Sequence, residues 1–344
     1  MKMSQMKFHE VADCWLQNAI IGLSYSWKTQ IISTVKHLNR SIGDKQIDEI
    51  KPMDIERLIK SLSVMNPNTK KPASKRLLKA VSNTANQIYV FAIENEITNK
   101  NPASGLIKKI PKNAPTKLVE ALTDYQKSIV MEVDHPLKLA AVIMMFMGLR
   151  TGEILALQWE DFDFEQLMVS VNKSCSRITE NKYTVKKGTK NGKSRIVPIP
   201  VSISTWLKEK CGTAKCDLVV PSNNNQLHTR STWKSSWNAY QNELNYYVYL
   251  TQCKEKGIVP KSKYSPTGTP DMGVRFNAHQ LRHTYATMLY HSNVDVLTAK
   301  ELLGHSDVKT TLGIYTHLDE KYKKINIIKF DNYIQAELLK ASSL

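Results

Sequence analysis

Long apolar runs and cysteines are scarce in this sequence of 344 residues. The apolar run that contains Ala140–Met147 is far shorter than the roughly 20 residues that a membrane span needs, so we expect no membrane association. The five cysteines are an odd number, and no apolar leader followed by small residues is found near the N-terminus. Both observations are typical of reduced thiols in a cytoplasmic protein.

Motifs for metals and nucleotides are also missing. Cys211 and Cys216 are five residues apart but have no second pair of ligands, and no cluster of Asp, Glu and His has the spacing of a metal site. No glycine-rich phosphate-binding loop occurs, which argues against ATP or GTP as a substrate. We therefore expect neither a metal nor any other cofactor.

Acidic residues are outnumbered by basic ones, with 31 Asp and Glu against 48 Lys and Arg, which gives a net charge of +17. This surplus indicates a polyanionic partner, because basic side chains that neutralise phosphates release condensed counterions. Nucleic acid is the favoured interpretation, and a lysine-rich solubilising surface is the alternative. Only nine of the basic residues are arginines. Since a guanidinium offers a fixed bidentate fork that an ammonium lacks, each arginine position is informative.

The first hundred residues have the pattern of a helical domain. Apolar residues recur at the spacing of amphipathic helices in four segments, 8–20, 27–38, 55–62 and 77–92. They predict a compact unit of four helices over residues 1–104. The prolines and lysines of residues 105–116 predict an extended interdomain linker.

A cluster of cations marks the start of the fourth predicted helix. Cations at a helix N-terminus oppose the macrodipole slightly, which makes a phosphate partner more attractive. A run of charge is also typical of a solvated helix face, so both interpretations stay open here. The candidate DNA-contacting residues are Lys70, Lys71, Lys75, Arg76 and Lys79.

The remainder of the chain, residues 117–344, is predicted to form a second domain that is mostly helical. Periodicity predicts helices over 122–133, 137–149, 203–211, 231–250, 278–291, 295–303, 308–317 and 319–340. Residues 254–273 are polar and contain Pro and Gly, so we expect a surface loop there.

Strand-like segments fall between these helices, at residues 167–171, 183–185 and 195–199. The last two bracket residues 186–194, a Gly- and Lys-rich stretch typical of a β-hairpin tip. The predicted fold class is therefore mainly α with a small antiparallel β-sheet.

Two short segments place arginines beside other chemically active side chains. Arg150 follows the long apolar helix and stands three residues before Glu153, so it can pair with that carboxylate or face a ligand. His279 and Arg282 are also three residues apart. Helical spacing puts these two on one face, where they can address one small anion together.

Two further candidates follow nearer the C-terminus. His305 comes directly after Gly304, which marks a helix end, and Tyr315 lies ten residues beyond His305. Taken singly, a His or a Tyr in such a place is more often a satisfied core group. Together the candidates supply what phosphodiester chemistry without a metal needs, namely directional cationic donors and a nucleophile with proton-transfer partners.

The segments that carry these residues resemble the signature segments of the tyrosine recombinases of the phage-integrase type. They read GLRTGEILALQW, HQLRHTYATML, LLGHSDVKTTLGIYTH and, in the predicted hairpin, TKNGKSRIVPI. The helical domain that ends in NP-A before a basic linker is similar to that family's core-type DNA-binding domain. The resemblance implies a SAM-like four-helix domain followed by a mixed α/β catalytic domain. Many members of the family also carry an N-terminal arm-binding domain, which we do not expect here because the first predicted helix begins near Phe8.

The resemblance also implies roles for the candidate residues. Arg150 and Arg282 match the two arginines that clamp the scissile phosphate. Tyr315 matches the nucleophile that forms a 3′-phosphotyrosyl link and leaves a free 5′-hydroxyl. His279 matches the base or hydrogen-bond partner of the tyrosine, and His305 matches the side chain that supports the phosphate through a hydrogen bond.

Two supporting roles are implied in the same way. Glu153 matches an acidic position that buttresses the catalytic pocket. Lys190 matches the lysine that protonates the leaving 5′ oxygen, but Lys186, Lys187 and Lys193 share its turn and are alternatives.

The activity implied is site-specific recombination, for integration or excision of a mobile element or prophage, without metal or ATP. The expected partners are double-stranded DNA at the nucleoid, a homotetramer on two DNA sites, and accessory DNA-bending or directionality factors. A type IB-like topoisomerase uses the same chemistry and is one alternative. An inactive DNA-binding relative is the other, and the presence of all six catalytic candidates argues against it.

Overall fold

The structure is a computed structural model of the chain, and it describes residues 6–115, 119–188, 194–263, 265, 268–315, 331 and 334. The chain divides into two compact units. The first, here called the helical unit, comprises residues 1–118 with 177–180. The second, here called the mixed unit, comprises residues 119–176 with 181–344.

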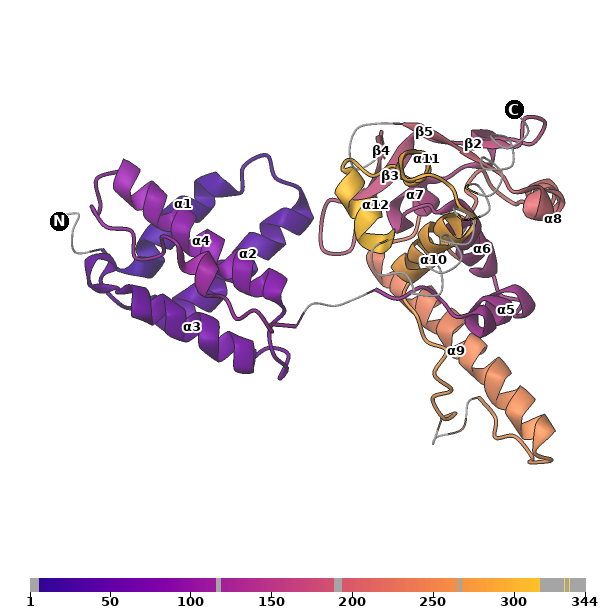
Figure 1. Ribbon diagram of the computed structural model, residues 1–344, viewed down its shortest axis with the longest axis horizontal. Coiled ribbons are helices and arrows are strands. Elements are labelled where there is room, and N and C mark those ends of the chain that lie inside the picture. Colours follow the sequence, from indigo (N-terminus) through magenta and orange to yellow (C-terminus); the bar gives the residue numbers. More distant parts are fainter. Residues whose placement is uncertain are drawn as a thin grey trace. The chain divides into compact units, whose positions relative to one another are not determined.

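Four α-helices build the helical unit, at the positions that periodicity predicted (Figure 1). Ser24 and Ser74 accept hydrogen bonds from the first turns of the second and fourth helices, and Pro52 opens the third. Their apolar faces enclose one core, in which Phe8 and Tyr89 are fully buried. The helices are α1 (Phe8–Ala19), α2 (Tyr25–Ile42), α3 (Pro52–Val64) and α4 (Lys75–Glu94).

The proline-rich segment after α4 packs against this unit up to the end of its described residues. It contains a 3₁₀ turn, η3 (Leu106–Lys109), which contacts α3 and α4. Leu106, Ile110 and Ala114 are buried in the same core as the helices. The spacing of four between these apolar residues gives the segment one inward face, so it adopts more structure than its prolines suggest.

The mixed unit is centred on two helices that pack closely, α6 (Lys138–Met147) and α10 (Ala278–His291). Gly148 ends α6 in the left-handed region, with φ of 68°. A Cβ at this position would lie 2.2 Å from a ring carbon of Tyr285 on α10, so the close approach requires glycine.

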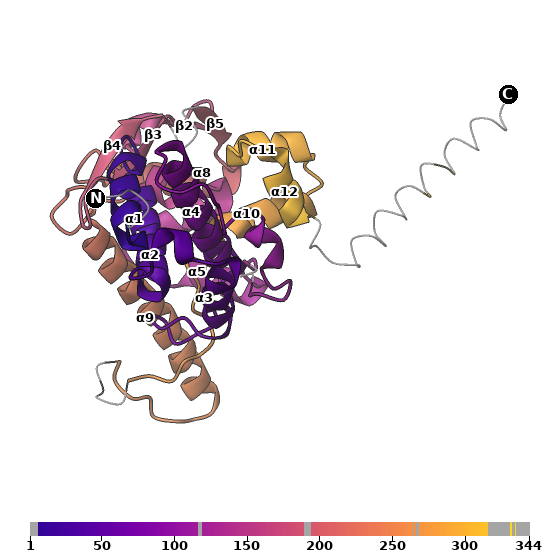
Figure 2. The ribbon, with the colours of Figure 1, turned by 90° about the vertical axis from the view of Figure 1, so that its left-hand side faces the viewer.

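Further helices surround this pair. In both views α11 and α12 lie beside α10 (Figures 1 and 2). The helix predicted over 231–250 is longer than expected and reaches Glu255. These helices are α5 (Asp124–Glu132), α7 (Thr151–Ala156), α8 (Val201–Gly212), α9 (Arg230–Glu255), α11 (Val296–Leu303) and α12 (Val308–Tyr315).

The strands form two small sheets. One is three-stranded, with order β1-β2-β5 and antiparallel pairing, and the other pairs β3 with β4. The expected fold class, mainly α with a small antiparallel sheet, is confirmed. The strands are β1 (Phe162–Asp163), β2 (Met168–Val171), β3 (Lys173–Arg177), β4 (Tyr183–Lys187) and β5 (Arg195–Pro198).

The predicted hairpin between the segments at 183–185 and 195–199 is wrong. Those segments are β4 and β5, which lie in different sheets. Only Asn172 separates β2 from β3, so β2 and β3 present one continuous arm, along which β5 pairs with β2 and β4 pairs with β3. The short connection between strands is therefore 178–182, and the stretch that follows β4 joins the two sheets.

Three sequence predictions lie wholly or partly outside the described residues. They concern Lys190, the side chain of Tyr315, and the amphipathic helix over 319–340. In the part of the chain that the structure describes, no helix is long and apolar enough to cross a membrane. Within the same residues, no group of three or more His, Cys, Asp or Glu side chains is arranged to hold a metal ion.

Candidate active site

The centre of the candidate site is the carboxylate of Glu153, whose side chain is 0% exposed. Arg150 precedes α7 as its N-cap, and Glu153 at the third helical position accepts the backbone N–H of Arg150 at 2.8 Å. The Arg150 guanidinium donates to Glu153 Oε1 through Nη1 at 2.7 Å. The capping pattern in the sequence thus places the first predicted arginine against the predicted acidic residue.

Arg195, the first residue of β5, donates hydrogen bonds to both oxygens of the same carboxylate. Its Nη1 donates to Oε1 of Glu153 at 3.0 Å and its Nη2 donates to Oε2 at 2.8 Å. Arg282 on α10 comes within 3.9 Å of Oε2 through Nη1, and it donates to the carbonyl of Gly148 at 2.7 Å. Three guanidiniums from three separate elements therefore surround one buried carboxylate.

The C-terminal end of α11 accepts hydrogen bonds from the same three guanidiniums. The last carbonyls of a helix have no partner within the helix, and they carry a partial negative charge that favours cations. Three successive carbonyls each accept a hydrogen bond from a different arginine: Leu302 from Arg195 Nε, Leu303 from Arg282 Nη2 and Gly304 from Arg150 Nη2. The helix end and the carboxylate thus fix the three side chains relative to one another.

The three guanidiniums differ in their exposure. The Arg150 side chain is 21% exposed, against 9% for Arg195 and 3% for Arg282. Burial and the nearby charge of Arg150 lower the pKa of Arg282 to about 9, which still leaves it charged at neutral pH. The cluster as a whole has more cationic than anionic groups, so an anion is the ligand that its electrostatics favour.

The charge state of Glu153 follows from its partners. Burial by itself raises the pKa of the carboxyl group, but the hydrogen bonds and charges of Arg195 and Arg150 outweigh that effect. The net result is a pKa of about 2. Glu153 is therefore ionised at neutral pH, and its contribution to stability depends on that charge.

His305 follows α11 and borders the cluster. Its Nδ1 lies 2.9 Å from Oγ1 of Thr311, a fully buried side chain on α12. Burial, and then the charges of Arg282 and Arg150, lower the pKa of His305 to about 4. The imidazole is thus neutral at neutral pH, and it can act through a hydrogen bond instead of a charge.

The three remaining predicted catalytic residues are His279, Tyr315 and Lys190. His279 is exposed on the first turn of α10, and its charge is among those that lower the pKa of His305. Tyr315 is the last residue of α12, which packs against α10 and α11, but its side chain is outside the described residues. Lys190 is outside them as well. The structure thus brings together Arg150, Glu153, Arg282 and His305 of the predicted set.

Two protein-family models match the sequence of this chain. Residues 112–322 match the model described as phage integrase family, and residues 8–109 match the phage integrase central domain. The chain belongs to the phage integrase family. The predicted function, site-specific recombination of mobile elements by a tyrosine recombinase that cleaves and rejoins DNA, is thereby confirmed at the level of the family.

Several named relatives share most of this integrase's length. It is 29% identical over 303 residues to a tyrosine recombinase XerC-like protein of Caldanaerobacter subterraneus subsp. tengcongensis, covering 83% of this chain and 72% of that protein. It is 27% identical over 272 residues to the ICEBs1 integrase of Bacillus subtilis, covering 76% and 67% of the two chains.

Solved structures show the same fold. The Tn1549 transposon integrase in complex with a circular intermediate DNA has a TM-score of 0.70 at 17% identity, covering 94% of this chain and 99% of that one. A lambda integrase dimer bound to a core site has a TM-score of 0.59 at 16% identity, covering 91% and 78% of the two chains.

Arg195 is the residue of this integrase's cluster that the motifs did not single out. Its contacts with Glu153 and Leu302 span 42 and 107 residues of sequence, and no local spacing reveals contacts of that range. One signal was available, because arginine is rare in this chain and Arg195 lies in the segment TKNGKSRIVPI.

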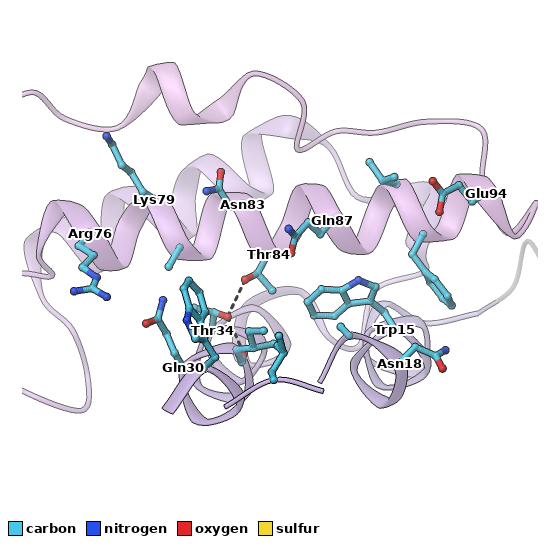
Figure 3. Close-up of a pocket in the computed structure, with 17 residues that line it drawn as sticks. Trp15, Asn18, Gln30, Thr34, Arg76, Lys79, Asn83, Thr84, Gln87 and Glu94 are labelled. Atoms are coloured by element: carbon cyan, nitrogen blue, oxygen red, sulfur yellow. Dashed lines mark hydrogen bonds between the residues drawn. The ribbon is translucent and has the colours of Figure 1, made fainter. Parts of the chain in front are cut away.

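The predicted DNA-contacting cations of the helical unit fall into three groups. Arg76 and Lys79 are exposed on α4 and line a groove of about 1000 Å³ between α4 and the helices α1 and α2 (Figure 3). Lys75 instead points its Nζ toward the carbonyl of Lys112 at 3.4 Å. Lys70 and the residue after it, Lys71, are exposed in the turn before α4.

Polar side chains continue the line of Arg76 and Lys79 along the groove. Asn83 and Gln87 follow at helical spacing on α4, and Gln30 of α2 lines the same groove (Figure 3). Amide and guanidinium groups are the side chains that pair with base edges, and cations contact phosphates. This face of the helical unit therefore has the chemistry of a nucleic-acid contact.

Proposed function

We propose that this integrase cleaves and rejoins double-stranded DNA with Tyr315 as nucleophile, as a homotetramer assembled on two DNA sites. The observation that carries the proposal is the convergence of Arg150, Arg282 and His305 at one end of α11. Such a set of donors fits one tetrahedral oxyanion. Relatives include integrases solved as dimers and tetramers on DNA, which supports the assembly proposed here.

The cleavage step is a direct displacement at phosphorus. The Tyr315 phenol oxygen attacks the scissile phosphorus and its proton passes to His279, while the bond from phosphorus to the 5′ oxygen breaks. Lys190 supplies a proton to that leaving oxygen, which becomes the 5′-hydroxyl. The reverse reaction with the 5′-hydroxyl of a partner strand restores the phosphodiester and the free tyrosine. The bond energy is held in the protein–DNA ester, so the chemistry needs no nucleotide.

The two arginines and His305 act on the charge that develops during this displacement. Arg150 and Arg282 donate to the non-bridging oxygens. Their positions are fixed before DNA binds by Glu153, by the carbonyls at the end of α11 and, for Arg282, by the carbonyl of Gly148. Because Nδ1 of His305 is engaged by Thr311, Nε2 is the ring nitrogen that supports the phosphate. Donors that are oriented in advance stabilise a transition state without reorganising.

Cleavage is tested with a nicked suicide substrate that traps the covalent intermediate. The full-length protein should form a DNA adduct that survives denaturation, and Tyr315→Phe should abolish it. Tyr125→Phe, which alters an exposed tyrosine on α5, is the matched control and should keep full adduct formation. An adduct that persists in Tyr315→Phe would assign the nucleophile to another residue.

The role of Lys190 is tested by changing the leaving group. When sulfur replaces the bridging 5′ oxygen, the leaving group is a thiolate, which needs no proton. The Lys190→Ala variant should therefore cleave such a substrate. Lys186→Ala, Lys187→Ala and Lys193→Ala are the controls from the same turn. If one of these variants is rescued by sulfur and Lys190→Ala is not, the acid is that lysine instead.

The DNA grip is proposed to include the α4 groove, with Arg76 and Lys79 on phosphates. Each phosphate contact that is lost should lower the slope of log affinity against log salt by about 0.9. Lys79→Ala is therefore expected to reduce the slope, whereas Lys60→Ala, on the exposed face of α3, should leave it unchanged. If Lys79→Ala and the unmodified protein have equal slopes, Lys79 does not contact a phosphate. Accessory DNA-bending factors and a location at the nucleoid fit this reaction and are part of the proposal.

A further inference from the structure

Arg195 has the contacts of a side chain that organises its neighbours. Its three guanidinium nitrogens all point to protein acceptors, two to the carboxylate of Glu153 and one to the carbonyl of Leu302 at 2.9 Å. Its side chain is 9% exposed, less than half the exposure of Arg150. A lysine could not reproduce this arrangement, because three donors at fixed angles require a guanidinium.

Two other arginine side chains also lie against the carboxylate that Arg195 binds. Arg150 donates to Oε1 of Glu153, and Arg282 lies 3.9 Å from Oε2. A carboxylate buried away from water must be neutralised by partners, because its desolvation is otherwise uncompensated. Without Arg195, Glu153 would keep the backbone N–H of Arg150 on Oε2, and its remaining charged partners would be the guanidiniums of Arg150 and Arg282, which are proposed to bind the phosphate.

Arg195 also adjoins the turn that carries His305. Gly304 ends α11 with φ of 61°, and a Cβ there would lie 3.0–3.3 Å from the Arg195 side chain. The glycine thus lets Arg195 reach the end of the helix, next to the carbonyl that holds Arg150. Through this contact β5, α7 and the end of α11 are joined by one side chain.

We propose that Arg195 is a positioning residue for DNA cleavage, which occupies Glu153 and the end of α11 so that Arg150 and Arg282 remain directed at the phosphate. This inference rests on the proposed function. The side chain itself does not touch the phosphate. Its effect on the reaction passes through the charge and orientation of the other two arginines.

The test compares Arg195→Gln, Glu153→Gln and the double variant Glu153→Gln/Arg195→Gln in the full-length protein. We expect Arg195→Gln to bind DNA within about threefold of normal and to form the covalent adduct on the order of 100-fold more slowly, the size of effect that misplaced groups produce. Because Arg195 acts on the other two arginines through Glu153, its loss should matter little once that carboxylate is gone, and the double variant should form the adduct within about threefold of the rate of Glu153→Gln alone. Arg275→Gln, an exposed arginine of the same unit, should cleave normally.

A second substrate separates positioning from a general loss of structure. A methylphosphonate at the scissile position lacks one charged oxygen, so less of its cleavage depends on the two phosphate-directed arginines. The slowing caused by Arg195→Gln, relative to the unmodified protein, should shrink by at least about tenfold on this substrate. A general defect would slow cleavage of both substrates equally.

The outcomes that overturn the proposal are distinct from failure of the proposed function. Three outcomes each contradict the positioning role: unchanged cleavage by Arg195→Gln, a double variant slowed by the product of the two single effects, or equal slowing on both substrates. If Arg195→Gln does not fold, Arg195→Lys provides the same comparison, because it keeps the charge but loses the fork. Should the unmodified protein form no adduct with any nicked substrate, the proposed function itself is refuted.

Discussion

Replacing Glu153 by Gln should destabilise the mixed unit by about 3 kcal/mol at pH 7. The pKa of this carboxyl falls from an ordinary value of 4.5 to about 2 in the folded chain. At about 1.4 kcal/mol for each pKa unit, the ionised form is favoured over the neutral form by roughly 3 kcal/mol. Glutamine resembles the neutral form in shape, and its amide N–H groups face guanidiniums that need acceptors.

The dependence of this effect on pH follows from the direction of the shift. Because the folded pKa is depressed, the stabilisation is present in full above about pH 4.5 and is lost as the pH falls toward 2. The difference in unfolding free energy between the unmodified protein and Glu153→Gln should be constant from pH 8 to pH 5. It should fall to less than half near pH 3.

Urea unfolding followed by tryptophan fluorescence measures this difference. Trp15 and Trp27 belong to the helical unit, so a background with both replaced by Phe leaves fluorescence from the mixed unit only. With a urea slope of about 2–3 kcal/mol per molar, the midpoint should fall by at least about 1 M. Glu160→Gln is the control: its side chain is 74% exposed beside Lys173, and it should change stability by less than about 0.5 kcal/mol.

Two results would refute the reasoning. A loss below about 1 kcal/mol at pH 7 would mean that the arginines do not depend on the carboxylate. A loss that stays constant down to pH 3 would mean that packing, and not ionisation of Glu153, provides the stabilisation.

Two further predictions concern the helices around the cluster. Thr311→Val removes the hydroxyl partner of His305 and should slow adduct formation about tenfold, the worth of one hydrogen bond, whereas Thr310→Val at the exposed neighbour should not. Equal rates for the two variants would contradict the role given to Thr311. Gly148→Ala should lower the unfolding free energy by about 2–4 kcal/mol, because it combines a left-handed backbone with a clash against the ring on α10. Gly273→Ala has a similar φ and no neighbour within 4 Å, so it should lose only the backbone part, and equal losses would rule out the clash.

Most helices of this chain could be predicted because their apolar spacing is local information. The same holds for Arg150 with Glu153, since the two residues are only three positions apart. The roles assigned to these residues remain predictions. Arg195 was not predicted because its partners are set by the packing of β5 against α7 and α11, which no short window of sequence contains.

The strand pairing shows a different limit of sequence reasoning. The Gly- and Lys-rich stretch after β4 has the composition of a hairpin turn, and composition alone favoured pairing of β4 with β5. The actual partners follow from the near continuity of β2 and β3 around Asn172, which offers one long arm to both strands. Short strands have several sterically acceptable partners, so tertiary packing decides among them.

If the cluster binds the scissile phosphate as proposed, the end of α11 also affects how easily the DNA leaves. A helix C-terminus counts as about half a negative charge, so together with Glu153 it reduces the three guanidiniums to a net charge of about +1.5. An intact phosphodiester brings one negative charge, whereas the five-coordinate species formed on attack approaches two. The site is thus nearer in charge to the transition state than three unopposed arginines would be, and it holds intact DNA less tightly. Rejoined strands can therefore be released, although the site contains three arginines.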